Sequence, residues 1–273
     1  MPMALQDGRD RLSLQLRAAG LSRSDNVIVH AAGGALPENC AAAIIDAIAL
    51  CIGPKGTVVI PTFSSDALMP PLSLRQSSDA RLRAERTVPG YDALSSPADL
   101  SGPLGEAFRT LPGVLRSNHP VFSLAARGPW ASDIVERHPR DWALGVDGPM
   151  GRLLEMPNMR VLLIGGAAWL DCPVMVLAES MARHRRLAVM RFKERLSGRW
   201  IHARDIAVDR EGIYDRIGRE LGEIGLLRRA PLGRTVVEVA SMDEMVGYAA
   251  PRIAEAVGEI ADRPTALASA TAG

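Results

Sequence analysis

The chain has 273 residues, of which 47% are hydrophobic and 23% are charged. This balance is typical of a globular protein and excludes a chain that is disordered throughout. The 32 basic and 31 acidic side chains give a net charge of +1, so charge provides no drive toward nucleic acid or an anionic membrane. Three scattered cysteines, with no paired Cys/His ligands, exclude a disulfide framework and predict no metal site.

The N-terminus carries Asp7 and Asp10 and has no continuous apolar stretch, which excludes a signal peptide. The most apolar run, at 161–170, is about half of a membrane span. We therefore expect a cytoplasmic protein that contacts no membrane.

The first sixty residues predict helices and strands in alternation. The expected elements are a helix at 8–20, a strand at 27–30, a helix at 38–51 and a strand at 57–60. This order predicts parallel strands joined by a right-handed crossover in an α/β protein. Ligands bind such sheets beyond the carboxyl ends of the strands, so residues 30–34 and 61–65 form one candidate site.

The rest of the chain predicts a long loop followed by further helices and strands. Residues 64–103 are rich in Ser, Pro and Asp and resemble a binding loop with one short helix at 79–86. The later helices are expected at 105–111, 129–137, 151–155, 174–186, 212–224 and 241–260, the strands at 121–126 and 160–164, and a hairpin at 192–206. We expect one domain over 1–262 and a flexible tail at 263–273.

Local motifs of common enzyme classes are absent from the sequence. There is no GxxxxGK[ST], HExxH or GxSxG, and the paired glycines at 33–34 and 165–166 do not form GxGxxG. The sequence therefore gives no positive support to dinucleotide binding.

The first candidate catalytic residue is His119, in a polar loop at 116–120 before a predicted strand. An imidazole whose pKa lies near the working pH is suited to act as a general base. The alternative is a structural role in which His119 caps the turn before Pro120.

Three further candidates lie in the loop and the helix that follow the strand at 160–164. Glu179 is either a desolvated functional carboxylate in an apolar helix or a partly exposed group at the helix edge, and the residues alone favour the edge. Asp171 and Cys172 follow a loop of small residues where a nucleophile could sit, although a lone cysteine is more often an inert hydrophobe.

Residues 181–204 contain eight basic side chains and one acid, which sum to +7. One interpretation is an anion site for a phosphate or carboxylate. The other, which the near-neutral chain slightly favours, is a solvated face paired with acids elsewhere.

Eight stretches, in this order, carry a family resemblance. They are Val29-His30-Ala31-Ala32, Gly53 to Thr62 (GPKGTVVIPT), Phe108-Arg109, Pro112-Gly113, Arg116 to Pro120, Ser123 to Gly128, Val161 to Gly165 and Leu177-Ala178-Glu179. The ordered set resembles the aminoglycoside 3-N-acetyltransferases, the antibiotic N-acetyltransferase family, over roughly residues 8–257.

The resemblance implies a mixed, partly parallel sheet flanked by helices, distinct from the GNAT fold. It implies acetyl-CoA or another acyl-CoA as co-substrate and a small-molecule amine as acceptor, and it leaves a homodimer open. In that interpretation the loops at 30–34, 62–65 and 116–120 form the coenzyme channel. Its residues are His30, Ala31, Ala32, Thr62 and Ser117, with Arg109 or Arg116 near the phosphates.

The resemblance also implies what is missing. The two serines that follow the histidine in the family are Ala31 and Ala32, and the histidine expected before Leu-Ala-Glu falls on Val176. His119 then remains as the base, with Glu179 as its partner or the amine anchor. The basic segment predicts a neutral or anionic acceptor rather than a typical aminoglycoside.

Three functions remain open. The first is an N-acyltransferase with a biosynthetic or resistance role. The second is the same scaffold repurposed for another reaction that uses Cys172, His119 and Glu179. The third is a non-catalytic ligand-binding homologue.

Overall fold

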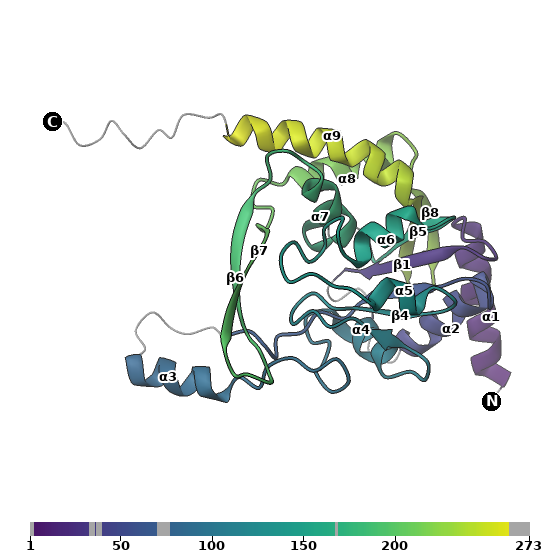
Figure 1. Cartoon of the computed structure of the whole chain (residues 1–273). Helices are drawn as coiled ribbons and strands as arrows, with labels where there is room; N and C mark the ends of the chain where they lie inside the picture. The colour runs from purple at the N-terminus through teal and green to yellow at the C-terminus, as the bar shows by residue number, and fades with distance from the viewer. Residues whose placement is uncertain (1–2, 33–35, 37–39, 70–76, 167–168, 262–273) are drawn as a thin grey trace.

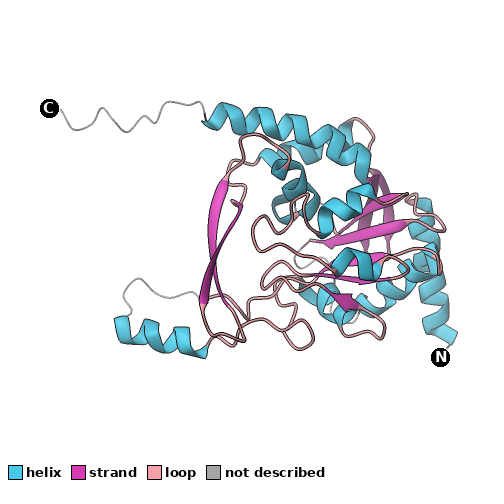
Figure 2. Ribbon diagram, in the orientation of Figure 1, coloured by secondary structure: helices cyan, strands magenta, loops and turns pink. Residues whose placement is uncertain are grey.

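The computed structural model describes residues 3–32, 36, 40–69, 77–166 and 169–261, and within them places a seven-stranded sheet with helices on both faces (Figures 1 and 2). The strands of this sheet are β1 (Asn26–Ala31), β2 (Val58–Pro61), β3 (Leu115–Arg116), β4 (Leu124–Arg127), β5 (Met159–Ile164), β8 (Arg228–Leu232) and β9 (Thr235–Ser241). The helices are α1 (Met3–Ala18), α2 (Ala41–Ile52), α3 (Ser78–Thr87), α4 (Gly102–Arg109), α5 (Ala131–Val135), α6 (Pro149–Glu155), α7 (Pro173–Ser180), α8 (Ile213–Glu223) and α9 (Met242–Ala261). The expected tail at 263–273 lies outside the described residues, as do Gly33 and Gly34 of the expected site.

The sheet has the order β3-β4-β2-β1-β5-β9-β8. Its central strand β1 runs parallel to β2 on one side and to β5 on the other. The outer strands pair antiparallel. The prediction of a mixed, partly parallel sheet flanked by helices is confirmed.

Alternating side chains of the central strands build two separate cores. Val27 and Val29 of β1 belong to the core that also contains apolar residues of α1, α2 and α4. Ile28 belongs to the core that contains residues of α5 to α9. Each fully buried aliphatic side chain contributes about 1.5–3 kcal/mol, so burial on both faces fixes the register of β1. The carboxyl end of β1 is thereby held in place at the edge of the sheet.

A second, two-stranded sheet is formed by β6 (Leu187–Lys193) and β7 (Trp200–Ile206), which confirms the expected hairpin and extends its first strand. Phe192 and Ala203 on its inner face pack into a small core with Tyr91 and Val121. Figure 1 shows this hairpin beside the body that contains the large sheet, with α3 at one of its ends. Helix α3 has no buried side chain and is held by polar contacts, including the Lys193 ammonium, which donates to the Val88 carbonyl at 2.8 Å.

Two element boundaries differ from the prediction because side chains capture backbone amides. The helix expected at 174–186 ends at Ser180, and the Glu179 carboxylate accepts the Arg186 N–H at 2.9 Å after the chain has turned. The strand expected from residue 121 begins at Leu124. The amides of Val121 and Phe122 donate to His119 Nδ1 instead of to a neighbouring strand.

The strands β8 and β9 were not predicted from the sequence. Val237 and Val239 of β9 are buried and alternate with less buried residues, which is the signal of a strand. Its antiparallel pairing with β5 completes the sheet beyond the parallel centre.

Candidate active site

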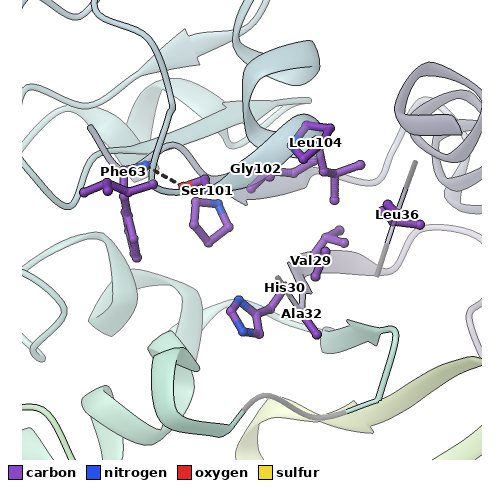
Figure 3. A pocket seen from close by; sticks show the side chains of 13 residues that line it. Val29, His30, Ala32, Leu36, Phe63, Ser101, Gly102 and Leu104 are labelled. Atoms are coloured by element: carbon purple, nitrogen blue, oxygen red, sulfur yellow. Dashed lines mark hydrogen bonds between the residues drawn. The ribbon is translucent and has the colours of Figure 1, made fainter. Parts of the chain in front are cut away.

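A cavity of about 120 Å³ lies at the carboxyl ends of β1 and β2, where the order of the elements predicts a ligand site (Figure 3). The lining residues come from the end of β1 and the turn after it, from the end of β2, and from the start of α4: 29–32, Leu36, Ile60, Pro61, Phe63 and 100–104. Both parallel strands end here because they share one direction, so their last residues meet at the same edge of the sheet.

The cavity wall is mainly apolar. Among its described lining residues, His30 and Ser101 are the two with polar side chains. Ser101 precedes α4, and its Oγ accepts the Phe63 N–H at 2.6 Å. Helix α4 approaches β2 closely because Gly105 has no Cβ, which would lie 2.7 Å from the Pro61 carbonyl oxygen.

Three of the residues predicted to bind the coenzyme line this cavity. His30, Ala31 and Ala32 form its floor at the end of β1, and all three are partly exposed. Thr62 is next to the cavity in sequence but is fully buried, and its hydroxyl donates to the Ser123 carbonyl at 3.1 Å. The cavity thus includes the loop that follows β1 but not the polar loop at 116–120.

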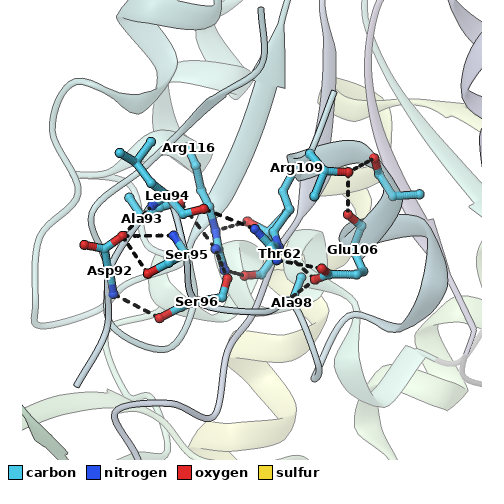
Figure 4. A network of polar contacts seen from close by, with 12 residues as sticks. Thr62, Asp92, Ala93, Leu94, Ser95, Ser96, Ala98, Glu106, Arg109 and Arg116 are labelled. Carbon is cyan, nitrogen blue, oxygen red and sulfur yellow. Dashed lines mark hydrogen bonds and ion pairs between the residues drawn. The ribbon is translucent and has the colours of Figure 1, made fainter. Parts of the chain in front are cut away.

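Arg116 is the centre of an internal network that holds the loops together (Figure 4). Its guanidinium donates to the Thr62 hydroxyl and carbonyl, to the Ser123 hydroxyl and to the Ser96 carbonyl. It also lies over the Tyr91 ring, 5.0 Å from the ring centre. These contacts engage the guanidinium and tie the loops at 62 and 96 together.

Arg109, the other predicted phosphate ligand, forms a two-pronged ion pair with Glu106 on the same helix (Figure 4). Glu106 in turn accepts the Ala98 N–H at 2.7 Å. The Arg109 hydrogen bonds, with lesser help from the Ala98 amide, hold the pKa of the Glu106 carboxyl below its ordinary value. This pair fastens the loop before α4 to the helix.

His119 is 1% exposed and both of its ring nitrogens are engaged. Because Nδ1 accepts the amides of Val121 and Phe122, the proton is on Nε2, which donates to the Arg140 carbonyl at 3.3 Å. Burial lowers the pKa of His119 to about 4. The structural alternative, in which His119 caps the turn around Pro120, is confirmed by these contacts.

Ser117 belongs to the same buried cluster. Its hydroxyl donates to His138 Nδ1 at 2.8 Å, and its Oγ accepts the Leu124 N–H at 2.9 Å. The His138 ring lies 4.8 Å from the His119 ring, and burial, with a smaller effect of His119, lowers the pKa of His138 to about 3. No sequence pattern indicated a role for His138, which lies 19 residues after His119.

Glu179 is fully buried, so the placement at an exposed helix edge was wrong. Its carboxylate forms a two-pronged ion pair with Arg186 and accepts the Tyr214 hydroxyl at 2.6 Å. Burial opposes the charge of Arg186, but hydrogen bonds to Glu179 and Asp209 raise its pKa above the ordinary value. The structure does not join Glu179 to His119, because each is saturated by other partners.

The two remaining candidates lie at the start of α7. Cys172 is fully buried in the core beneath α8 and α9 and occupies the N-cap position of α7. Asp171 ends a short 3-10 turn, Trp169–Asp171. Cys172 is not among the described residues that line the cavity.

Four of the eight basic side chains at 181–204 form ion pairs with acids from elsewhere in the chain, which agrees with the second interpretation for those four. The ion pairs are Arg186 with Glu179, Asp209 and Glu211, Arg191 with Glu85, Arg195 with Asp92, and Arg204 with Asp141. The Arg185 guanidinium lies 4.0 Å from the centre of the Trp142 ring and donates to the Ser180 carbonyl. None of these basic groups lines the cavity at the ends of β1 and β2.

Sequence reasoning placed Phe63 in the candidate site at 61–65 but missed Ser101 as a cavity residue. A signal was present in Ser101-Gly102-Pro103, because a serine before a proline is typical of a helix start. The expected helix began at residue 105, which placed this start inside the preceding loop.

The fold and the cavity define an α/β protein with a cavity at the carboxyl edge of a mixed sheet. The family model of the aminoglycoside 3-N-acetyltransferases matches residues 28–254. The chain belongs to this family of enzymes, as its ordered motifs predict.

Two relatives show the extent of the likeness. The chain is 36% identical over 219 residues to aminoglycoside N(3)-acetyltransferase IX of Micromonospora chalcea, covering 76% of this chain and 75% of that protein. It is 33% identical over 278 residues to aminoglycoside N(3)-acetyltransferase VII of Streptomyces paromomycinus, covering 88% and 92%.

A solved structure extends the comparison to a coenzyme complex. The fold matches that of AAC-IIIb in a binary complex with CoASH at a TM-score of 0.75 and 25% identity, covering 91% of this chain and 96% of that one. Among the described residues, no helix is long and apolar enough to cross a membrane. The same residues hold no group of three or more His, Cys, Asp or Glu side chains arranged for a metal ion.

Proposed function

We propose that the protein transfers an acyl group from a CoA thioester to an amine, with the thioester end of the coenzyme in the cavity at the ends of β1 and β2. The observation that carries this proposal is a narrow apolar cavity bordered by one imidazole, His30, and one hydroxyl, Ser101. A thin chain such as a pantetheine arm suits a small apolar channel with a few placed polar groups.

The residues of the cavity fit the reactive end of the coenzyme better than its phosphates. Ala31 and Ala32 leave space where larger side chains would narrow the channel. Arg109 and Arg116 are occupied by Glu106 and by backbone carbonyls, so the proposal assigns the phosphates to neither.

We assign the general base to His30 rather than to His119. An acylation base must accept the proton that the amine loses, and it must lie beside the reacting atoms. His30 borders the cavity, whereas His119 is buried with both nitrogens engaged and its pKa is lowered to about 4. His119 then serves to shape the loop at 116–122.

The acceptor is an amine, and aminoglycosides are the first class to test. The argument for an anionic acceptor rested on the basic segment at 181–204, but none of its basic side chains lines the cavity, and four of its arginines form ion pairs with acids. The relatives at 33–36% identity are named for aminoglycoside acetylation.

A second candidate function is ligand binding without turnover. The saturation of His119 and Glu179 by structural partners favours it, because neither group is left for chemistry. This candidate shares the coenzyme site and differs from the first in the absence of acyl transfer.

Calorimetry with CoA and acetyl-CoA tests the site, using Ala32→Leu to fill the cavity and Ala42→Leu, on the exposed face of α2, as the matched control. We expect micromolar binding to the wild type and to A42L and at least about tenfold weaker binding to A32L, because the added side chain displaces the ligand. Equal binding to all three would refute the assigned cavity.

Release of free thiol from acetyl-CoA in the presence of amines tests the reaction. Turnover with aminoglycosides supports acyl transfer. Coenzyme binding without turnover, on aminoglycosides and also on amino acids and other amines that carry an acidic group, supports ligand binding alone. No binding at millimolar CoA would refute both.

A further inference from the structure

Two polar side chains face the same apolar cavity from different elements. His30 comes from the end of β1 and Ser101 from the start of α4, and Figure 3 shows them on opposite sides of the space between the two elements. A base on one wall and a hydroxyl on the other is the arrangement that attack on a carbonyl group requires.

The Ser101 hydroxyl accepts one hydrogen bond, and its own proton is available for donation. Its Oγ accepts the Phe63 N–H at 2.6 Å, which fixes the position of the oxygen. Among the described residues no acceptor is found for the hydroxyl proton, and Ser101 does not bond to the first turn of α4 as N-cap serines commonly do. Donation from Phe63 also polarises the O–H bond and strengthens it as a donor.

The rest of the site gives this donor particular weight. The two residues after His30 are alanines, so beyond the His30 ring the end of β1 offers no side-chain donor. The Ala32 amide is also occupied, because it donates to the Ile164 carbonyl at 2.9 Å. Among the described side chains that line the cavity, Ser101 can donate a hydrogen bond to a ligand oxygen without breaking a hydrogen bond that it already makes.

From this geometry we infer that Ser101 is a catalytic residue that donates a hydrogen bond to the thioester carbonyl oxygen of the bound acyl-CoA. This inference rests on the proposed function. The amine nitrogen forms a bond to the carbonyl carbon while His30 takes the proton that the nitrogen loses, and the charge that develops on oxygen is stabilised by Ser101. The carbon–sulfur bond then breaks, and the CoA thiolate recovers a proton from His30, so the products are the amide and CoASH.

The variants Ser101→Ala and Ser101→Thr separate this role from a structural one. S101A removes the donor and also leaves the Phe63 amide without its acceptor, so its melting temperature must be measured beside its kinetics. S101T keeps the hydroxyl and the acceptor. Ser132→Ala, on the exposed surface of α5, is the matched control.

Two ligands report the hydrogen bond without turnover: acetyl-CoA, which has the carbonyl, and S-ethyl-CoA, which lacks it. We expect the wild type, S101T and S132A to bind acetyl-CoA about three- to tenfold more tightly than S-ethyl-CoA, and S101A to bind both equally. With an acceptor that supports turnover, kcat of S101A should fall by about 100- to 1,000-fold and S101T should retain activity.

The two proposals fail in different ways. If neither ligand binds the wild type, the coenzyme site itself is refuted, and the role of Ser101 with it. If both ligands bind the wild type with equal affinity, or if folded S101A keeps the preference for the carbonyl, the role of Ser101 is refuted and the coenzyme site stands.

Discussion

The substitution Glu179→Gln distinguishes a structural carboxylate from a catalytic one. Glu179 is fully buried and accepts four hydrogen bonds, from the Arg186 backbone amide, from the Arg186 guanidinium at both of its oxygens, and from the Tyr214 hydroxyl. Glutamine keeps the shape but replaces one acceptor oxygen by an amide that points donors at a guanidinium. If Glu179 is structural, the change should lower stability and leave the chemical step intact.

The remaining partners of Arg186 determine how much stability the Glu179→Gln substitution should cost. Breaking a buried ion pair costs about 3–5 kcal/mol when the remaining charge has no other partner. Arg186 keeps Asp209 and Glu211, so its charge remains compensated. We therefore expect a loss of about 3 kcal/mol in the free energy of unfolding, which for a chain of this size lowers the melting temperature by roughly 6–12 °C.

Thermal unfolding and coenzyme calorimetry on the same preparations provide the assay. Tyr214→Phe removes a single hydrogen bond and should cost about 1–1.5 kcal/mol, and Glu211→Gln, at an exposed pair partner, should cost less than about 0.5 kcal/mol. An E179Q protein with an unchanged melting temperature and a turnover reduced more than about 100-fold would refute the structural interpretation.

Three further predictions concern groups whose environment fixes their charge or occupies their donors. His119 and His138 have lowered pKa values, so the unfolded chain binds protons before the folded one, and each histidine should lower the free energy of unfolding by about 1.4 kcal/mol for each pH unit from 6.5 toward 4. His138→Gln should remove its own share, about 1.4 kcal/mol per pH unit, from the slope measured in urea titrations, and an unchanged slope would contradict this. Asp205 is 4% exposed, its Oδ2 has no hydrogen-bond partner among the described residues, and burial raises its pKa to about 6. Asp205→Asn should therefore stabilise the protein by up to about 3 kcal/mol at pH 7.5 and by progressively less below pH 6, and a destabilised D205N at pH 7.5 would be the contrary result. Arg109→Gln should leave the affinity for CoA within about twofold in calorimetry, since the guanidinium is held by Glu106; a tenfold loss at an unchanged melting temperature would place it at the phosphates.

The position of the site could be predicted from the sequence because it depends on strand direction. The runs at 27–30 and 57–60 are short, β-rich and separated by one helix, which allows parallel pairing and little else. The structure pairs Val27 with Val58 and Ile28 with Val59, and the residues after both strands meet at the cavity. His30, Ala31 and Ala32 were found in this way, from topology and not from their chemistry.

The functions of the polar side chains could not be predicted in the same way, because they depend on partners far away in the sequence. Glu179 is saturated by Tyr214, 35 residues later, and Arg116 by Thr62, 54 residues earlier. A run of basic residues such as 181–204 has no visible counter-charge until the hairpin brings it to Glu85, Asp92 and Asp141. Local sequence shows which groups can ionise, but only the fold shows which of them are already paired.

Spare hydrogen-bonding capacity then separates the residues that can act on a ligand from those that hold the fold. A buried polar group with every donor and acceptor engaged must break a contact before it can bind a substrate, at a cost of about 1–3 kcal/mol for each group left unpaired. Arg116, His119 and Glu179 all belong to this engaged class. Ser101 differs from them because its oxygen is fixed by Phe63 while its proton remains available to the cavity. The chemistry of this protein is therefore expected at the apolar cavity, where few polar groups are present, and not in the polar clusters that attract attention in the sequence.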